Sequence, residues 1–230
     1  MTAIKAALFD KDGTLIDFHR TWDRAIGHAL RGAAVDDEHL TKAAALLEFD
    51  LRTNSISASS PLIADSNDQV LALLESVVDT TRFIRLVERY SLEELAPAIG
   101  LPDALHQLAA REIALAVVTN DYESMTSAQL RQLGWHPLFA HIIGSDSGFG
   151  AKPDPDIVIG ALGLCGVDPT EAVLIGDTTH DLIAGRDAGV RTVLVTNSGE
   201  PSREALQLAD HTITTMAALV PTLTEAGLLR

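Results

Sequence analysis

Residues 3–16 decide the fold, and they read Ala3-Ile4-Lys5-Ala6-Ala7-Leu8-Phe9-Asp10-Lys11-Asp12-Gly13-Thr14-Leu15-Ile16. The apolar run at the start of this stretch has the length and flanks of a buried strand. Two carboxylates, Asp10 and Asp12, follow the run, and Gly13 then permits a sharp turn or a close approach to a ligand. A surface turn is the plain alternative, because Asp-Gly is a common turn pair. A calcium loop fits poorly, since Leu15 and Thr21 would replace its glycine and its glutamate.

Composition limits the classes of partner that the chain can bind. Of its 230 residues, 47% are hydrophobic but only 4% are aromatic, so Ala, Leu, Ile and Val must form most of the core. The length allows one domain with a sizeable core and a second, smaller one. The net charge of −15 and the lack of a basic patch argue against nucleic acid or an anionic membrane as a partner. An anionic substrate would need positive charge placed locally at its site.

Cysteine and histidine usage narrows the chemistry further. The single cysteine, Cys165, rules out a disulfide within the chain, and its apolar surroundings favour a core thiol over a nucleophile. The eight histidines are scattered without metal-ligand spacing, which argues against a zinc site. The N-terminus lacks the features of a secretion signal, and no apolar run has the length of a membrane span. We expect a cytoplasmic protein, and the sequence does not indicate its oligomeric state.

The pattern of apolar residues changes after residue 16. Residues 17–92 show helical spacing and no convincing strand. The predicted helices of this segment are 20–32, 36–49, 67–78 and 80–90, with a polar, serine-rich loop at 51–67. From residue 92 onwards, strands alternate with helices. The predicted strands are 113–119, 141–145, 172–176, 192–195 and 212–214, and the predicted helices are 102–111, 122–133, 156–165, 180–188 and 202–208, followed by a final helix.

Alternation of this kind predicts a parallel sheet with helices on both faces. The expected fold is therefore α/β. Residues 1–16 and 93–230 would form a doubly wound, Rossmann-like core, with an α-helical domain of residues 17–92 inserted after the first strand. Ligands of such sheets bind beyond the carboxyl ends of the strands. The polar residues expected there, or in the adjoining loops, are Asp10, Asp12, Thr119, Asn120, Lys152 and Asp177.

Several acids gathered in one crevice would repel each other and a phosphate unless a cation lay among them. Oxygen ligands from Asp10 and Asp177 suit Mg²⁺, which keeps several waters and often shares phosphate oxygens. Helix capping is the alternative for Asp177 and for Asp181, which falls in the first turn of the next helix. For Thr119 and Asn120, the alternative is an ordinary turn at the end of a strand.

Four stretches resemble, in order and spacing, the motifs of the haloacid dehalogenase superfamily of phosphotransferases. They are Phe9-Asp10-Lys11-Asp12-Gly13-Thr14-Leu15-Ile16-Asp17, Val118-Thr119-Asn120, Gly150-Ala151-Lys152-Pro153-Asp154-Pro155 and Gly176-Asp177-Thr178-Thr179-His180-Asp181. The resemblance covers nearly the whole chain outside the helical insert, which corresponds to the mobile cap of that family. Within the superfamily, the chain most resembles phosphoglycolate phosphatases.

The resemblance implies phosphoryl transfer in two steps. Asp10 would attack phosphorus and form an aspartyl-phosphate. Asp12 would protonate the leaving oxygen and then accept a proton from the hydrolytic water. The hydroxyl of Thr119 and the backbone N–H of Asn120 would bind the phosphoryl oxygens. Lys152 would neutralise both the acids and the transferring group.

The resemblance also implies a Mg²⁺ cofactor and a specific loop at the site. The implied ligands are Asp10, Asp177 and the backbone carbonyl of Asp12, with Asp181 at a greater distance, acting through water or Lys152. Gly13 would shape the loop that receives the phosphoryl group. Lys11 departs from the apolar residue often found between the two motif aspartates. Arg52, in the polar loop of the insert, is a candidate for binding a substrate carboxylate or hydroxyl.

The expected reaction is hydrolysis of a small phosphomonoester, such as phosphoglycolate. Asp12 favours phosphoryl transfer, because dehalogenases of the superfamily need neither a second aspartate nor a metal. One alternative is a phosphoglucomutase-like transferase, which would return the phosphoryl group to a sugar. The other is a catalytically idle binding protein on the same fold, against which the intact set of motif residues argues.

Overall fold

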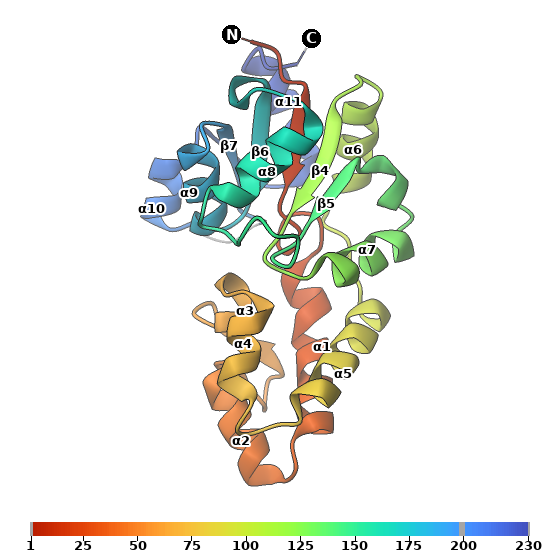
Figure 1. The fold of residues 1–230 in the computed structure, drawn as a ribbon, viewed down its shortest axis with the longest axis vertical. Coiled ribbons are helices and arrows are strands. Elements are labelled where there is room, and N and C mark those ends of the chain that lie inside the picture. The colour runs from red at the N-terminus through yellow and green to blue at the C-terminus, as the bar shows by residue number, and fades with distance from the viewer. Residues whose placement is uncertain (1, 198–200, 230) are drawn as a thin grey trace. The chain divides into compact units, whose positions relative to one another are not determined.

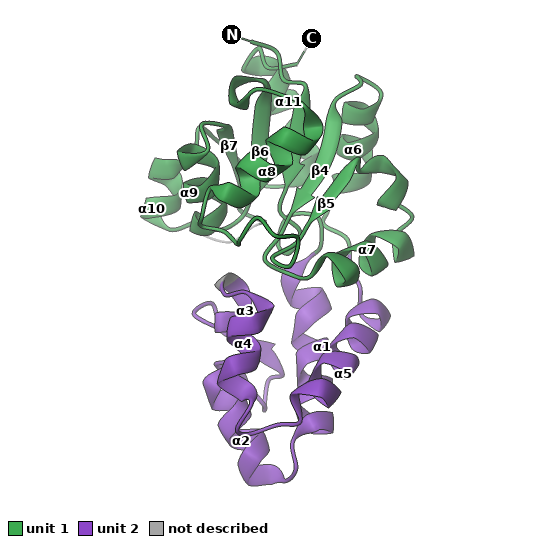
Figure 2. Cartoon of the chain, viewed as in Figure 1, with its two compact units in different colours: residues 1–16, 97–230 green, residues 17–96 purple. Residues whose placement is uncertain are grey.

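The chain folds as two compact units, which Figure 2 shows in separate colours. The computed structural model describes residues 2–197 and 201–229. Unit 1 comprises residues 1–16 and 97–230, and unit 2 comprises residues 17–96. The second limit of unit 2 falls at 96 rather than at the expected 92, because its last helix continues to Glu93.

In the described part of the chain, six strands form a parallel sheet in unit 1, with helices on both faces (Figure 1). The strand order is β5-β4-β1-β6-β7-β8, and each neighbouring pair is parallel. The strands are β1 (Ala6–Phe9), β4 (Ala114–Val118), β5 (His141–Ile143), β6 (Ala172–Gly176), β7 (Arg191–Val195) and β8 (His211–Ile213). The helices are α6 (Leu101–Ala109), α7 (Glu123–Gln132), α8 (Asp156–Cys165), α9 (Thr179–Asp187), α10 (Arg203–Leu208) and α11 (Leu219–Glu225). The predicted doubly wound α/β core is confirmed.

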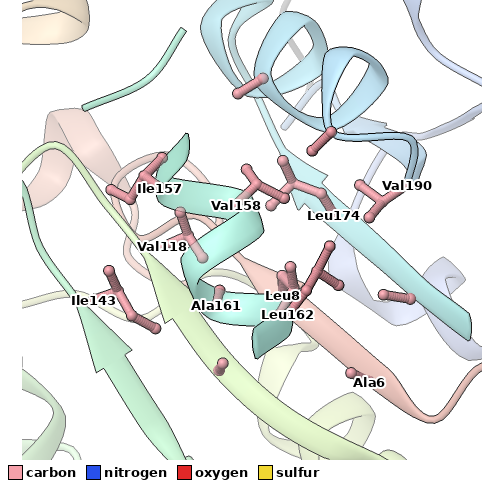
Figure 3. Packing of buried hydrophobic residues seen from close by; sticks show 14 residues of the cluster. Ala6, Leu8, Val118, Ile143, Ile157, Val158, Ala161, Leu162, Leu174 and Val190 are labelled. Atoms are coloured by element: carbon pink, nitrogen blue, oxygen red, sulfur yellow. The ribbon is translucent and has the colours of Figure 1, made fainter. Parts of the chain in front are cut away.

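Strand β1 is buried on both faces, as its continuous apolar run predicts. Ala6 and Leu8 belong to the cluster that packs beneath α8, together with Ile157 (Figure 3). Successive side chains of a strand point to opposite faces. On the other face, Phe9 meets the ring of Phe139 edge-on, with ring centroids 6.2 Å apart. Packing on both faces therefore fixes the position of the loop that follows β1.

The direction in which strands are added reverses at β1. After β1, the chain adds β4 and β5 on one side and then β6, β7 and β8 on the other. Phe9 pairs with Val117 of β4 and with Ile175 of β6, so the three central strands end at nearly the same level. Where the connections of neighbouring parallel strands diverge in this way, they leave a crevice at the carboxyl ends. Residues that follow β1, β4 and β6 therefore surround one point.

Unit 2 is mainly helical. Its helices are α1 (Phe18–Ala33), α2 (Asp37–Leu46), α3 (Pro61–Ala64), α4 (Asn67–Leu74) and α5 (Thr80–Glu93). The side chain of Asp17 accepts a hydrogen bond from the backbone N–H of Arg20 and caps α1. Asp79 caps α5 in the same way through the N–H of Arg82. Such caps satisfy backbone donors that have no partner within the helix, so the two helices begin at defined residues and pack together.

The prediction that the insert lacks strands is wrong. β2 (Phe49–Asp50) and β3 (Ser55–Ile56) form an antiparallel pair, and two residues are too few to show an alternating pattern. The helix predicted at 36–49 ends at Leu46. Glu48 then has a left-handed φ of 49°, which is incompatible with continuing the helix. Glutamate rarely adopts this conformation, so the residue type does not predict it. The predicted loop at 51–67 also contains the four-residue helix α3.

Within residues 2–197 and 201–229, every helix is too short or too polar to cross a lipid bilayer.

Candidate active site

A buried lysine lies between two buried carboxylates in unit 1. Lys152 belongs to the loop between β5 and α8, and its Nζ lies 2.5 Å from Asp10 Oδ1 and 2.6 Å from Asp181 Oδ1. Asp10 follows β1, and Asp181 lies in the first turn of α9. All three side chains are more than nine-tenths buried. Buried charges are tolerated only when they are paired, and these pairs place positive charge among acids in a strongly acidic chain.

Asn120 fixes the backbone of Lys152. Its side-chain amide donates to the carbonyl oxygen of Lys152 at 2.9 Å, and its Oδ1 accepts from the N–H of Lys152 at 2.8 Å. The side-chain amide of Asn120 thus hydrogen-bonds to both the backbone N–H and the backbone carbonyl of Lys152. This side-chain role was not predicted. The contact predicted between the backbone N–H of Asn120 and a phosphoryl oxygen stays a prediction.

Asp181 caps a helix and also pairs with Lys152. Its Oδ2 accepts from the N–H of Thr178 at 3.0 Å and from the hydroxyl of Thr178 at 2.7 Å, which completes a capping box at the start of α9. Its Oδ1 accepts from Lys152. The capping alternative for Asp181 is therefore realised by Oδ2, and its part in binding Mg²⁺ stays a prediction. The residue that caps α9 is Thr178, so the capping alternative for Asp177 is wrong.

Burial dominates the pKa values of these groups. Burial raises the pKa of Asp10 from 3.8 to about 7; Lys152 opposes the rise and the carboxylate of Asp181 adds to it. For Asp177, burial first and then Asp10 and Asp181 raise the pKa well above its ordinary range. Burial alone would lower the pKa of Lys152, but Asp10 and Asp181 outweigh it, so the pKa lies above the usual value. Full ionisation of Asp10 and Asp177 therefore calls for more positive charge than one lysine provides.

The three acids fit a divalent cation. Asp10, Asp177 and Asp181 each present one ligand atom, and these atoms lie within 4.8 Å of one another. Asp177 Oδ1 is buried and has no hydrogen-bond partner among the residues that the structure describes. A buried oxygen without a donor is costly, and a bound cation would satisfy it. Because the donors are carboxylate oxygens, the cluster suits a hard ion such as Mg²⁺.

Gly13 makes room for Asp177. A Cβ built at Gly13 would lie 2.0 Å from Asp177 Oδ2, far inside van der Waals contact. The φ of Gly13 is +85°, which a side chain would also disfavour. The side-chain amide of Asn197, which follows β7, donates to the carbonyl of Gly13. The loop is thus tied in place with its backbone against a carboxylate, while the predicted contact of Gly13 with substrate stays a prediction.

Thr119 and Asp12 differ in how far they are exposed. Thr119 is buried after β4, and its hydroxyl oxygen accepts from the N–H of Asp121 at 3.1 Å. The turn alternative is realised there, yet the hydroxyl keeps a proton to donate.

The side chain of Asp12 is 22% exposed, against 9% for Asp10, and its Oδ2 lies 2.6 Å from Lys11 Nζ. Asp12 is therefore the more accessible of the two motif acids.

Arg52 lies in unit 2, in the loop that joins β2 to β3. Its side chain is 86% exposed, and its guanidinium is 3.9 Å from the carboxylate of Asp50. Asn54 of the same loop accepts from Arg31 at 2.9 Å and donates to the carbonyl of Asp23 at 2.9 Å, so the loop is anchored on α1. The role of Arg52 in substrate binding stays a prediction.

Sequence reasoning missed several residues that support the candidate site. Asn197 follows β7, so the same strand-end argument that singled out Asp177 would have found it. Gln129 lies on α7 and contacts Lys11 at 2.9 Å. No motif or charge marks Gln129 in the sequence, and only the packing of α7 reveals its position.

The sequence model of the haloacid dehalogenase-like hydrolases matches residues 7–195. The chain belongs to this family. A phosphoglycolate phosphatase from Caulobacter vibrioides is 33% identical over 195 residues, which cover 81% of this chain and 77% of that protein. An N-acetylmuramic acid 6-phosphate phosphatase from Pseudomonas aeruginosa is 29% identical over 84% of this chain and 81% of that protein. A structure from Haemophilus somnus, described as a predicted phosphoglycolate phosphatase, has a TM-score of 0.72 and 22% identity, covering 96% of this chain and 99% of that one.

As a haloacid dehalogenase-like hydrolase, the protein is an enzyme, so the predicted family and the predicted class, a hydrolase, are confirmed. The matched segment runs from β1 to β7 and includes all four quoted motifs. It therefore contains each residue that the structure brings together around Lys152.

Proposed function

We propose that this hydrolase is a Mg²⁺-dependent phosphatase that acts on a small phosphomonoester, phosphoglycolate or a close analogue, through an aspartyl-phosphate on Asp10. The observation that carries the proposal is the cluster of Asp10, Asp177 and Asp181 around the ammonium of Lys152 at the carboxyl ends of parallel strands. Such a cluster combines a buried nucleophile with local positive charge, which phosphoryl transfer requires. The names of the two curated relatives support the same class of substrate.

In the first step, a carboxylate oxygen of Asp10 attacks phosphorus, and the bond between phosphorus and the ester oxygen breaks. Asp12 gives its proton to that oxygen as the alcohol leaves. The hydroxyl of Thr119 donates to a phosphoryl oxygen, and Lys152 balances the charge on Asp10 and on the transferring group. The greater exposure of Asp12 supports this division of roles, because a proton donor must reach the leaving group.

In the second step, water attacks the phosphorus of the aspartyl-phosphate and passes a proton to Asp12. The bond between phosphorus and Asp10 breaks, and inorganic phosphate leaves. Asp10 is then again a carboxylate and Asp12 again carries its proton, so the net reaction is ester plus water to alcohol plus phosphate. Dividing one difficult transfer into two easier ones is the advantage of a covalent nucleophile.

Asp10, Asp177 and the backbone carbonyl of Asp12 would bind Mg²⁺, with Asp181 acting through Lys152. Bound Mg²⁺ would supply the positive charge that allows a phosphate dianion to approach these carboxylates.

The substrate is assigned by class, because one family accommodates several esters. The curated relatives include phosphatases named for a small carboxylate-bearing ester and for a larger sugar ester. Unit 2, as the proposed cap, would choose between such esters. Arg52 offers an exposed guanidinium, which binds a carboxylate well, and this favours a substrate like phosphoglycolate.

A panel of phosphate esters at millimolar Mg²⁺ tests the proposal. We expect phosphate release, with the highest kcat/KM on a small ester that carries a carboxylate. Isomerisation of a sugar phosphate without phosphate release would instead show the phosphoglucomutase-like reaction. A protein that turns over no ester in the panel would be the idle binding protein, and either result would contradict the proposal.

Mg²⁺ should also stabilise the folded protein, a property that can be measured without substrate. A ligand that binds only the folded state at a hundred times its Kd adds about 2.7 kcal/mol to the free energy of unfolding, which corresponds to about 5–10 °C in Tm for a chain of this size. The measurement is thermal unfolding with and without Mg²⁺ at constant ionic strength. Asp177→Asn should remove most of the shift, because it changes the buried oxygen that has no other partner. An equal shift in this variant would place the ion elsewhere.

A further inference from the structure

The side chain of Lys11 is completely buried beside Asp12, Asp121 and α7. Its Nζ lies 2.6 Å from Asp12 Oδ2, 2.9 Å from Asp121 Oδ2 and 2.9 Å from Gln129 Oε1. Lys11 thus donates a hydrogen bond to Gln129 and forms ion pairs with Asp12 and Asp121. The reaction proposed above gives this group no role.

Two of the three partners of Lys11, Asp121 after β4 and Gln129 on α7, are buried. Asp121 is buried; its N–H donates to Thr119 Oγ1 at 3.1 Å, and its Oδ1 accepts from the N–H of Tyr122 at 2.8 Å. Gln129 is completely buried in α7. Their burial, and the bonds of Asp121 at the end of β4, make both side chains suitable anchors for the ammonium of Lys11.

The third partner, Asp12, is the most exposed of the three. Its side chain is 22% exposed, and the next residue is Gly13, which has a left-handed backbone. A carboxylate in this position needs an external contact to keep one orientation. One contact that the structure provides is the ammonium of Lys11, which links Asp12 to Asp121 and Gln129.

Burying an ammonium is costly even when it is paired, and an apolar side chain would avoid that cost. A buried lysine at this position is explained if its ammonium keeps the carboxyl group of Asp12 in one orientation. We propose that Lys11 is a positioning residue for Asp12, which fixes the carboxyl group where it delivers its proton to the leaving oxygen. The proposal rests on the proposed function, in which Asp12 is the general acid.

The dependence of rate on the leaving group tests this role directly. A phenol that is acidic, such as 4-nitrophenol, leaves with little help from a proton, whereas 4-methylphenol needs one. In Lys11→Met, we expect kcat/KM to fall by about 10- to 100-fold on 4-methylphenyl phosphate and by less than about 3-fold on 4-nitrophenyl phosphate. The ratio kcat/KM is used because it reports the steps up to and including the first phosphoryl transfer and excludes hydrolysis of the aspartyl-phosphate.

A matched control is Lys5→Met, because Lys5 is also in unit 1 but is 65% exposed and pairs with Glu171. It should leave kcat/KM unchanged on both esters. If Lys11→Met does not fold, Lys11→Met combined with Asp121→Asn removes the buried carboxylate that would be left without its ammonium. Gln129→Met keeps Lys11 itself but removes one anchor, and it should shift the leaving-group dependence in the same direction by a smaller factor.

Two results would overturn the role of Lys11. One is an equal loss on both esters in folded Lys11→Met, which indicates a structural effect only, and the other is no loss on either. Failure of the proposed function is recognised separately. If the wild-type protein releases no phosphate, or if Asp12→Asn affects both esters equally, then Asp12 is not the general acid, whatever the Lys11 variants show.

Discussion

Asp10→Asn should lower kcat by about 10⁴-fold or more on any ester that the protein hydrolyses, because an amide cannot serve as the attacking nucleophile. The same variant should form no acid-stable phosphoprotein when it is quenched during turnover of a ³²P-labelled ester. Asparagine has nearly the size of aspartate, and Asp181 still pairs with Lys152 at 2.6 Å, so the fold should persist. The expected loss therefore reports chemistry rather than unfolding.

The control for Asp10→Asn is Asp187→Asn, in α9. The side chain of Asp187 is 46% exposed and forms an ion pair with Arg186 at the surface, so its loss should change kcat by less than about twofold. Unfolding followed by circular dichroism verifies that both variants are folded. Native turnover in Asp10→Asn, or label retained on the variant, would rule out Asp10 as the nucleophile.

The core of the fold could be predicted from the sequence because its signals are local and strong. The run that forms β1 is apolar at each position, so it reads as a strand buried on both faces, and the structure buries it so. The later strands alternate with helices of ordinary length, which predicts parallel pairing before any contact is known. The strand order was not predicted, because pairing between β1 and β6 joins segments more than 160 residues apart.

One rule predicted part of the candidate site. Polar residues at the carboxyl ends of strands converge, and this rule selects Asp10, Thr119 and Asp177 without side-chain information. It does not say which atoms pair. The side-chain bonds between Asn120 and the backbone of Lys152, and the double use of Asp181, depend on loop conformations that neither periodicity nor residue type determines.

Unit 2 shows where pattern reasoning fails. The left-handed φ of Glu48 and the two-residue strands β2 and β3 leave no periodic signal, so the sequence predicts a helix that continues over Phe49 and a loop for the rest. The contacts of Lys11 were not predicted for a different reason. The sequence showed that a lysine is unusual at this position, but its partner Gln129 lies 118 residues away on a helix without any motif.

Gly13→Ala should lower kcat/KM by about 10²- to 10³-fold and remove the stabilisation by Mg²⁺, although it adds only one methyl group. The added Cβ would lie 2.0 Å from Asp177 Oδ2 and 2.4 Å from its Cγ, so one of the two groups must move. Asp177 carries the buried oxygen that the cation is expected to satisfy. A shift of this carboxylate therefore displaces a proposed metal ligand, and a misplacement of about 1 Å at a reacting centre can cost about 10²-fold in rate.

Part of any loss of folding stability in Gly13→Ala would come from the backbone, since a left-handed conformation costs an alanine about 1–2 kcal/mol. The variant Gly134→Ala measures this backbone cost alone. Gly134 has a φ of +73°, close to the +85° of Gly13, but no neighbouring atom lies within 4 Å of its added Cβ. Both variants should lose similar stability in the absence of metal through the backbone, with a further loss at Gly13 from the clash. Only Gly13→Ala should lose the Tm shift with Mg²⁺ and the activity. If Gly13→Ala keeps both, Asp177 is not a ligand of the ion.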